Sequence, residues 1–453
     1  MTNVRDMTRG SPTRLILAFS LPILATNALQ QLYSLVDSLV VGNILGVTEL
    51  SAVSSSGWLD WTVLSIAMGL AQGFAIQIAQ SFGAKHHAEL RRAVGQSLLI
   101  AAVTVVLLGA ASQLLLRPVL TLMKAPAETI DMTEAYLRII FAGLPLVMAV
   151  NVLGGFLRSV GDSRTPLIAM VFATVVNIGL DILFVSALHR VEGGAIATVC
   201  AQAVSALICF LAVRRMPLLH PSREDLRPDR AMCRRLLRLG GPIAFQNFVI
   251  SVGGLVLQTV VNGYPFPFIA GYNTASRMQG LVEMAGGSLG GGVATFAGQN
   301  TGARRLDRVR EGLRKSALIG FLLALTVGAL IVIFGRQLLS LFMGSDERTL
   351  LLYDQVMQSG YRFLCVMAAG LPMLYLLFVY RSTLQGMGDT VIPMLSGFVE
   401  LAMRIGMALL LPLLFHEWGV YIAEIAAWIG AAVLLIIGCY RRLRRMEAGT
   451  EEA

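Results

Sequence analysis

The chain has 453 residues, of which 56% are hydrophobic and 14% charged, with a net charge of +9 and a mean hydropathy of +0.71. This composition lies well outside the range of soluble domains, so it excludes an ordinary soluble enzyme or binding module and predicts an integral membrane protein. The five cysteines have no paired spacing and no neighbouring histidine cluster. We therefore predict neither a disulfide framework nor a metal site.

Twelve apolar stretches follow one another along the chain, each close to the ~20 residues that cross roughly 30 Å of hydrocarbon. The first has no small-residue cleavage site, so we expect a retained helix and not a signal peptide. The predicted fold class is an all-α integral membrane protein with twelve transmembrane helices. The stretches run approximately over 15–41, 52–80, 94–116, 137–157, 165–187, 193–213, 239–262, 267–297, 316–335, 359–380, 391–414 and 418–440.

The two halves of the chain repeat the same residues in the same order. Pro22 returns as Pro242, 220 residues later, and Gln80 returns as Gln299, 219 residues later. Six stretches fall in each half, an even number, so the halves share one orientation and the repeat is parallel. We predict an N-terminal six-helix lobe (1–213), a cytoplasmic basic linker (214–238), a C-terminal six-helix lobe (239–440) and a cytoplasmic tail (441–453).

Lysine and arginine gather on alternate loops. They are frequent before residue 15, in 81–93, 158–164, 214–238 and 303–315, and after residue 440. The positive-inside rule places these segments, and both termini, on the cytoplasmic side of a bacterial inner membrane. The positive charge is thus explained by topology and not by nucleic-acid binding. For the linker, binding of anionic lipid head groups is an alternative to simple anchoring.

A charged residue within an apolar stretch costs free energy to insert into the bilayer, so such residues indicate a functional site. In the first half these are Asp37, Asp60 and Asp181. Asn177 lies four residues before Asp181, so both share one helical face. With Asp37 from the first helix, they would form an oxygen-rich pocket for a proton or Na⁺. The alternative is that these acids lie at water-filled helix ends.

The second half does not repeat this pocket. Asp37 corresponds to Leu257 and Asp181 to Ala408. Instead, a second-lobe ionic cluster is predicted from Glu400 and Arg404, spaced i,i+4, with Glu424 as a third member. It would be either a fixed structural lock or part of a substrate wall.

Other polar and aromatic residues of the stretches are candidates for a substrate cavity. Asp60 lies between Trp58 and Trp61, an arrangement suited to a flat organic cation, although an interfacial aromatic belt explains it equally well. Arg277 and Glu283 are six residues apart, roughly on opposite faces of a helix, so we do not expect them to pair. The full candidate set is Gln30, Tyr33, Asp60, Trp61, Arg277 and Glu283.

Taken in order, these residues resemble the multidrug and toxic compound extrusion (MATE) family. The resemblance extends over the whole chain and is closer to the DinF-like than to the NorM-like branch, because the stretches 242–254 and 372–380 hold none of the acids of the NorM-like branch. It rests on Pro22-Ile23, Leu35-Val36-Asp37, Val41-Gly42, Gln80-Ser81-Phe82-Gly83-Ala84, Gly161-Asp162, Pro166, Asn177, Asp181, Gly194 and Ala197-Thr198.

The resemblance implies two six-helix lobes that form a V and an antiporter that exports cationic or amphipathic drugs by alternating access, driven by H⁺ or Na⁺. It also implies a coupling-ion site at Asp37, Asn177, Asp181 and Thr198, no other cofactor, and no enzymatic activity. The expected partners are small organic cations or amphipathic drugs and the lipid bilayer, and the protein is expected to be a monomer. A lipid-linked oligosaccharide flippase of the same superfamily is the alternative, with Arg277 and Arg404 as its candidate diphosphate contacts.

Overall fold

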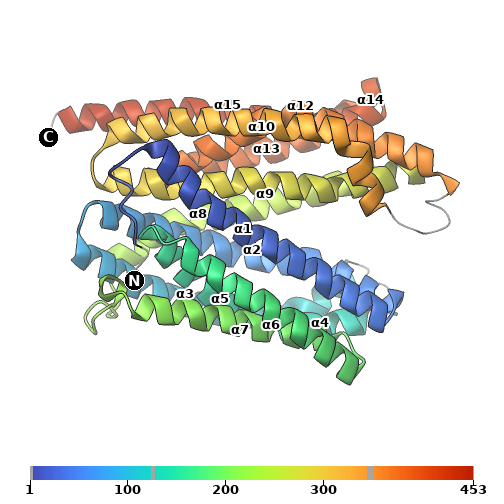
Figure 1. Cartoon of the computed structure of the whole chain (residues 1–453), viewed down its shortest axis with the longest axis horizontal. Helices are drawn as coiled ribbons and strands as arrows, with labels where there is room; N and C mark the ends of the chain where they lie inside the picture. The colour runs from blue at the N-terminus through green and yellow to red at the C-terminus, as the bar shows by residue number, and fades with distance from the viewer. Residues whose placement is uncertain (1–3, 124–127, 344–350, 452–453) are drawn as a thin grey trace. The chain divides into compact units, whose positions relative to one another are not determined.

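The computed structural model describes residues 4–123, 128–343 and 351–451, and within these ranges the chain forms helices and no β-strand (Figure 1). Helices suit an apolar surrounding because they satisfy their own backbone hydrogen bonds. In chain order the elements are α1 (Pro12–Ile44), α2 (Val47–Gly83), α3 (His87–Leu122), α4 (Ile130–Ala142), α5 (Leu144–Ser159), α6 (Arg164–Leu188), α7 (Glu192–Arg214), the short 3₁₀-helix η1 (Pro217–Leu219), α8 (Arg230–Val261), α9 (Phe266–Gly302), α10 (Leu306–Phe342), α12 (Tyr353–Gly386), α13 (Val391–Leu410), α14 (Pro412–Phe415) and α15 (Glu417–Glu451).

Ten of the described helices are long and apolar enough to cross a membrane, and α4 and α5 together make an eleventh that is bent by 45°. The predicted stretch 137–157 is this bent pair. The predicted stretch 267–297 is helical as part of α9, but α9 is not among the eleven. Its sequence includes Arg277, Gln279 and Glu283 and a glycine-rich second half. The all-α membrane fold is therefore confirmed. Within the described residues, eleven of the twelve expected spans are long and apolar enough to cross a membrane.

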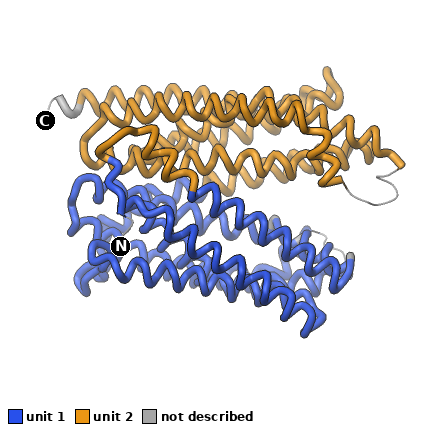
Figure 2. The backbone as a smooth tube through the Cα atoms, in the orientation of Figure 1, with its two compact units in different colours: residues 1–7, 22–244 blue, residues 8–21, 245–453 orange. Residues whose placement is uncertain are grey.

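The described chain forms two compact units (Figure 2). Unit 1 contains residues up to Met7 and Pro22–Ala244, whereas unit 2 contains Thr8–Leu21 and residues from Phe245 onward. The boundaries thus fall inside α1 and inside α8, at or next to the repeated prolines. The predicted lobes, 1–213 and 239–440, were placed by the sequence repeat, and this division stays a prediction.

Small residues let helices approach closely at equivalent places in both units. In unit 1, a Cβ atom at Gly73 on α2 would lie 2.2 Å from the Cα of Gly240 on α8. In unit 2, a Cβ atom at Gly292 on α9 would lie 2.2 Å from Ser20 Oγ on α1. Gly292 follows Gly73 by 219 residues and Gly240 follows Ser20 by 220, so the contact obeys the repeat. Such contacts replace the hydrophobic effect as the source of helix association in lipid.

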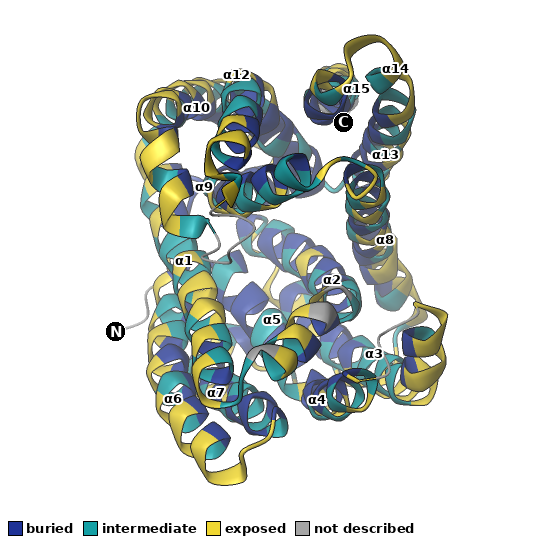
Figure 3. Cartoon of the chain, turned by 90° about the vertical axis from the view of Figure 1, so that its right-hand side faces the viewer, coloured by how far each residue is buried: buried dark blue, intermediate teal, exposed yellow. Residues whose placement is uncertain are grey.

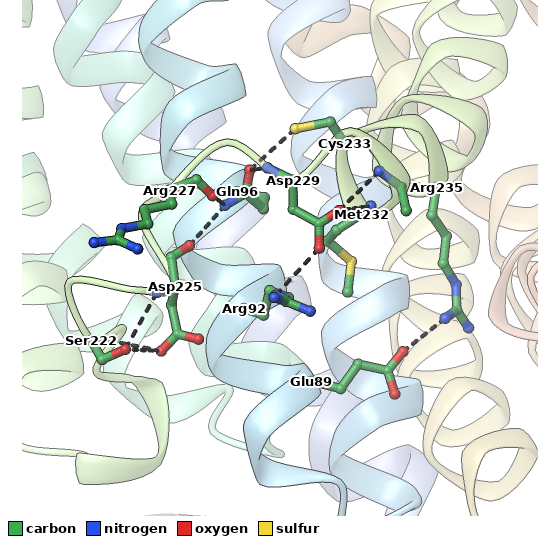
Figure 4. Close-up of polar contacts among 11 residues, drawn as sticks. Glu89, Arg92, Gln96, Ser222, Asp225, Arg227, Asp229, Met232, Cys233 and Arg235 are labelled. Carbon is green, nitrogen blue, oxygen red and sulfur yellow. Dashed lines mark hydrogen bonds and ion pairs between the residues drawn. The ribbon is translucent and has the colours of Figure 1, made fainter.

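The basic linker is docked on unit 1 and is not a loose tether. Gln96 on α3, which is 0% exposed, donates from Nε2 to the carbonyl oxygens of Asp225 (2.7 Å) and Arg227 (2.8 Å) (Figure 4). Its Oε1 accepts from the backbone N–H of Asp229 (3.0 Å) and from the thiol of Cys233 (3.2 Å). All four hydrogen-bonding positions of one amide are therefore used to hold the linker.

The residues beside Gln96 complete this attachment. A Cβ atom at Gly95 would lie 2.4 Å from the carbonyl oxygen of Asp225, so only glycine lets the linker come this close. Asp229 accepts hydrogen bonds from the backbone N–H groups of Ala231 and Met232 and so caps the start of α8. Figure 3 shows where the exposed residues lie on the helices. Large hydrophobic side chains are exposed on many of these helices, for example Leu107 on α3, Val175 on α6 and Ile333 on α10, as expected where lipid surrounds a bundle.

Candidate functional site

Three of the predicted coupling-site residues are buried together in unit 1. Asp37 on α1 is 7% exposed, and Asn177 and Asp181 on α6 are 1% and 0% exposed. Asn177 and Asp181 lie one helical turn apart on the same face of α6, as their spacing predicted. The helix α6 packs against α7, which supplies the opposite wall of the pocket.

Gly194, near the start of α7, provides the space in which the carboxyl groups meet. A Cβ atom at this position would lie 2.9 Å from Asp37 Oδ1 and 3.9 Å from Asp181 Oδ1. Both oxygens therefore face the same bare segment of α7, and the two carboxyl groups interact with each other. The structure brings two acids from separate helices to one point.

The polar atoms of this pocket are poorly hydrogen-bonded. Asp37 Oδ1, both carboxylate oxygens of Asp181 and both side-chain polar atoms of Asn177 are buried and form no hydrogen bond of ordinary geometry with any residue that the structure describes. Their interactions are with one another, between Asp37 and Asp181 and between Asn177 and Asp181. A buried polar group without a partner costs about 1–3 kcal/mol, so a group of five such atoms indicates a ligand. Four of the five are oxygens, the donor type that hard cations prefer. The residues present therefore fit a proton or a small alkali cation.

Further polar groups surround the pair. The hydroxyl groups of Tyr33 on α1 and Tyr136 on α4 interact electrostatically with the carboxyl groups of Asp37, Asp60 and Asp181. Asp60 on α2 is half-buried, and its Oδ1 has no hydrogen-bond partner among the described residues. The prediction that Asp60 contacts an organic cation stays a prediction; in the structure the same tyrosines interact with Asp60 and with Asp37 and Asp181.

The remaining first-half candidates lie at the edge of this pocket or outside it. Thr198 is half-buried on α7, one turn after Gly194 and on the same face. Gln30 is exposed on α1, and Trp61 on α2 is 51% exposed. The side chain of Trp58 lies outside the part of the chain that the structure describes.

The predicted ionic cluster of the second half is formed in unit 2. Arg404 on α13 donates from Nε and from one terminal nitrogen to the two carboxylate oxygens of Glu424 on α15, at 2.9 Å each. The same terminal nitrogen lies 3.2 Å from Glu400 Oε1. All three residues are less than 9% exposed. Arg404 is therefore committed to two carboxylates, which removes it as a free contact for a substrate diphosphate.

Two members of this network were missed from the sequence. Arg381 on α12 donates to Glu400 Oε2 at 2.9 Å, and Gln279 on α9 donates to Glu283 Oε1 at 2.7 Å and to Glu424 Oε1 at 3.5 Å. Arg381 directly follows the predicted stretch 359–380. A charged residue at the end of an apolar stretch was the signal that could have identified it. Gln279 carried no charge to mark it.

The two candidates of α9 separate in the structure. Glu283 is half-buried at the edge of the ionic cluster, whereas Arg277 is exposed, and no ion pair joins the two within the described residues. This agrees with their spacing of six residues, which places them on different faces of the helix.

Comparison with known proteins identifies the family. The MatE family model matches residues 22–183 and 242–410. The chain is 30% identical over 340 residues to the probable multidrug resistance protein YoeA of Bacillus subtilis, covering 73% of each chain. It is 24% identical to the probable multidrug resistance protein NorM of Thermotoga maritima, covering 92% of this chain and 88% of the relative. The chain belongs to the MATE family.

Solved structures agree with the fold of this MATE chain. A crystal structure of MATE in the bent conformation matches with a TM-score of 0.89 at 23% identity, over 98% of each chain. An outward-facing multidrug resistance MATE transporter of the MOP superfamily matches with a TM-score of 0.90 at 23% identity, over 97% of this chain and 98% of that one. As a MATE protein, the chain is a multi-span membrane transporter of bacterial type.

The family match covers most of the residues described above. Its first segment contains Asp37, Asn177 and Asp181, and its second contains Glu400 and Arg404. Glu424 lies beyond both segments. Glu424, which binds Arg404 through both carboxylate oxygens, therefore lies outside the region of this MATE chain that the family model matches.

Proposed function

We propose that this chain is a secondary antiporter that exports cationic or amphipathic organic compounds in exchange for H⁺ or Na⁺. Membership of the MATE family and relatives named as multidrug resistance proteins support the export of drugs. The single observation that supports ion coupling is the facing pair of carboxyl groups of Asp37 and Asp181. Within the described residues, Asp37 Oδ1 and both oxygens of Asp181 are buried and form no hydrogen bond of ordinary geometry.

The chemistry of the pair explains how an ion could be coupled to movement. Two ionised carboxylates that face each other in apolar surroundings repel strongly, and one bound cation relieves that repulsion. Asp37 and Asp181 belong to α1 and α6, so binding or release of the cation changes how firmly α1 is held against its neighbours. Because α1 contributes residues to both compact units, this change reaches both halves of the transporter.

Orientation follows from the charge distribution. The lysine- and arginine-rich loops, the linker 214–238 and both termini would face the cytoplasm of a bacterial inner membrane. Proton or sodium flow into the cell would then drive efflux by alternating access between the predicted lobes. Thr198, one turn after Gly194, would line the ion's route along α7.

The test is ethidium efflux from pump-deficient bacterial cells that express the wild type, Asp37→Asn or Asp181→Asn at equal levels. Asp307→Asn is the matched control, because the Asp307 side chain is 69% exposed. We expect gradient-dependent efflux by the wild type and the control and none by the other two variants. Loss of efflux without Na⁺, or after addition of a protonophore, identifies the coupling ion.

Two outcomes would contradict the proposal. Equal efflux by all variants would show that the carboxyl pair does not couple transport. Absence of ethidium efflux together with export of a flavin nucleotide would change the substrate class, since one relative at 23% identity, from Shewanella oneidensis, is named an FAD transporter. Cell-associated and medium flavin should therefore be measured in the same cultures.

A further inference from the structure

The docked linker 214–238 carries eight arginines, and most of them are not neutralised by the protein. All eight are exposed. Arg235 forms an ion pair with Glu89 on α3, at 2.7 Å. The guanidinium groups of six others form neither an ion pair nor a hydrogen bond with any described residue. These six are Arg214, Arg215, Arg223, Arg227, Arg230 and Arg234.

The acids of the linker neutralise arginines of α3 and not those of the linker itself. Asp229 lies 3.3 Å from Nε of Arg92, and Asp225 lies 4.0 Å from Nε of Arg91. Both carboxylates also accept hydrogen bonds within the linker or at the start of α8. Glu224 is the remaining acid of the linker, and it is exposed and forms no ion pair within the described residues. The excess positive charge is therefore left for an anion that is not part of the described chain.

The place of the linker in the chain puts these arginines at a membrane surface. The linker joins α7 to α8, and both helices are long and apolar enough to cross a membrane. Its residues Met216 and Leu219 are buried in the hydrophobic core of unit 1. In contrast, Leu226 and Leu237 are 40% and 46% exposed among the arginines. Exposed leucine beside arginine suits the boundary between lipid head groups and acyl chains.

The attachment of the linker fixes the positions from which the arginines extend. Gln96 binds the linker through all four hydrogen-bonding positions of its amide. In Figure 4 the side chain of Arg227 points away from Gln96. A guanidinium group contacts phosphate through two parallel hydrogen bonds, and it loses less entropy on binding when its backbone is already fixed. Simple anchoring by the positive-inside rule needs only the charges and not this attachment.

We propose that the linker 214–238, held in place by Gln96, is a preorganised binding surface for an anionic phospholipid such as phosphatidylglycerol. The unpaired arginines bind the phosphate, and the exposed leucines contact the acyl chains. This surface does not include the carboxyl pair of Asp37 and Asp181. The proposal therefore stands whether or not that pair couples export to an ion.

The experiment measures the melting temperature of the full-length protein in a non-ionic detergent, with added phosphatidylglycerol or with phosphatidylcholine of the same acyl chains. Phosphatidylglycerol should raise the melting temperature of the wild type by about 2–4 °C more than phosphatidylcholine does. The triple variant Arg223→Gln, Arg227→Gln and Arg230→Gln should lose at least half of this difference, because it removes three of the six unpaired charges. Equal shifts with the two lipids in the wild type would overturn the proposal.

A second triple variant, Arg441→Gln, Arg444→Gln and Arg445→Gln, is the matched control. These arginines are exposed on α15 and form no ion pair within the described residues, so the control removes the same charge from another basic segment. It should keep the full difference between the two lipids. An equal loss in both triple variants would show that the lipid responds to net charge alone, which would overturn a site on the linker.

Gln96→Met tests the attachment separately from the charge, because it keeps all eight arginines. Each protein is compared with itself in the two lipids, so a lower melting temperature of the variant does not affect the comparison. The difference between the lipids should fall by at least half, since the arginines lose their fixed positions. An unchanged difference would contradict a preorganised surface.

Inorganic phosphate, added at constant ionic strength, distinguishes a lipid from a free anion. It should leave both the melting temperature and the response to phosphatidylglycerol unchanged, because it has no acyl chain to contact the exposed leucines. If phosphate alone reproduces the shift, the linker binds any phosphate, and the assignment to a phospholipid is wrong.

Discussion

Unit 1 and unit 2 both bury carboxylates among apolar helices, yet they treat the charge in opposite ways. In unit 1, Asp37 Oδ1 and both carboxylate oxygens of Asp181 form no hydrogen bond of ordinary geometry with any described residue. In unit 2, Glu400 and Glu424 are each bound to arginine. At the unit 2 positions that correspond to Asp37 and Asp181 stand Leu257 and Ala408, both buried.

This difference shows what a duplicated membrane bundle can do with one scaffold. A carboxylate without a counter-charge can bind and release a cation, whereas one that is held by a bidentate arginine has little reason to change state. Unit 1 thus has the arrangement that reversible binding requires, whereas unit 2 holds its carboxylates Glu400 and Glu424 in ion pairs with arginine.

The largest expected effect is the difference in ethidium efflux between a variant of the unit 1 carboxyl pair and a variant of the unit 2 cluster. Asp181→Asn should abolish gradient-dependent ethidium efflux, because the facing carboxyl pair is lost. Glu400→Gln should leave a clearly measurable efflux, because Arg404 still holds Glu424. Efflux rates in cells with equal expression test this. The comparison fails if the Glu400 variant is inactive while the Asp181 variant works normally.

The next effect concerns stability within unit 2. Arg404→Met leaves Glu400 and Glu424 buried without their main counter-charge and should destabilise the protein by about 3–5 kcal/mol. The triple variant Glu400→Gln, Arg404→Met and Glu424→Gln removes the charges together and should recover much of that loss. Melting temperatures in detergent provide the measurement. A triple variant that is no more stable than Arg404→Met would show that the network is not held together by charge pairing.

Close helix packing should be more sensitive in unit 1 than in unit 2. Gly73→Ala places a methyl group 2.2 Å from the backbone Cα of Gly240 and should cost about 1–3 kcal/mol. Gly292→Ala places one 2.2 Å from Ser20 Oγ, a side-chain atom that can rotate away, so it should cost less. Gly241→Ala is the control, because a Cβ atom there has nothing within 4 Å, and it should be neutral or stabilising by up to ~1 kcal/mol. The readout is the yield of monodisperse protein together with its melting temperature, and a larger loss for Gly292→Ala than for Gly73→Ala would contradict this prediction.

The last prediction concerns the attachment of the linker 214–238. Gln96→Met leaves the carbonyl oxygens of Asp225 and Arg227 without their donor and should cost about 1–3 kcal/mol. Its repeat counterpart 219 residues later, Lys315, forms an exposed pair with Glu311, so Lys315→Met should cost no more than ~1 kcal/mol. Limited proteolysis of the linker 214–238 should become faster only in the Gln96 variant. Equal cleavage of both variants would contradict the role of Gln96.

Local spacing was enough to predict several members of both sites. Asn177 and Asp181 share a helix face because they are four residues apart, and the same spacing predicted the contact between Glu400 and Arg404. The repeat also showed that the first-half acids have no second-half counterparts. These statements need only helical geometry and the cost of charge in lipid.

Other members depend on how separate helices turn toward each other. Gly194 admits Asp37 and Asp181, and Gln279 bridges Glu283 and Glu424 across 145 residues of sequence. Gln96 binds the linker from more than 100 residues away, a contact that the basic composition of the linker did not indicate. No local pattern records which face of one helix meets which face of another, so these roles were not predictable.

The sequence by itself determined a duplicated all-α membrane protein, the position of its spans apart from the polar α9, and the acids that matter, because hydropathy and helical period are local properties. The tertiary structure decided which charges are neutralised and which are left open, because a counter-charge comes from whichever helix packs nearby. The packing of the helices therefore leaves Asp37 and Asp181 as a candidate ion site. It also joins Glu400, Arg404 and Glu424 in ion pairs. Glu283 is hydrogen-bonded to Gln279 and, among the described acids of that cluster, has no arginine partner.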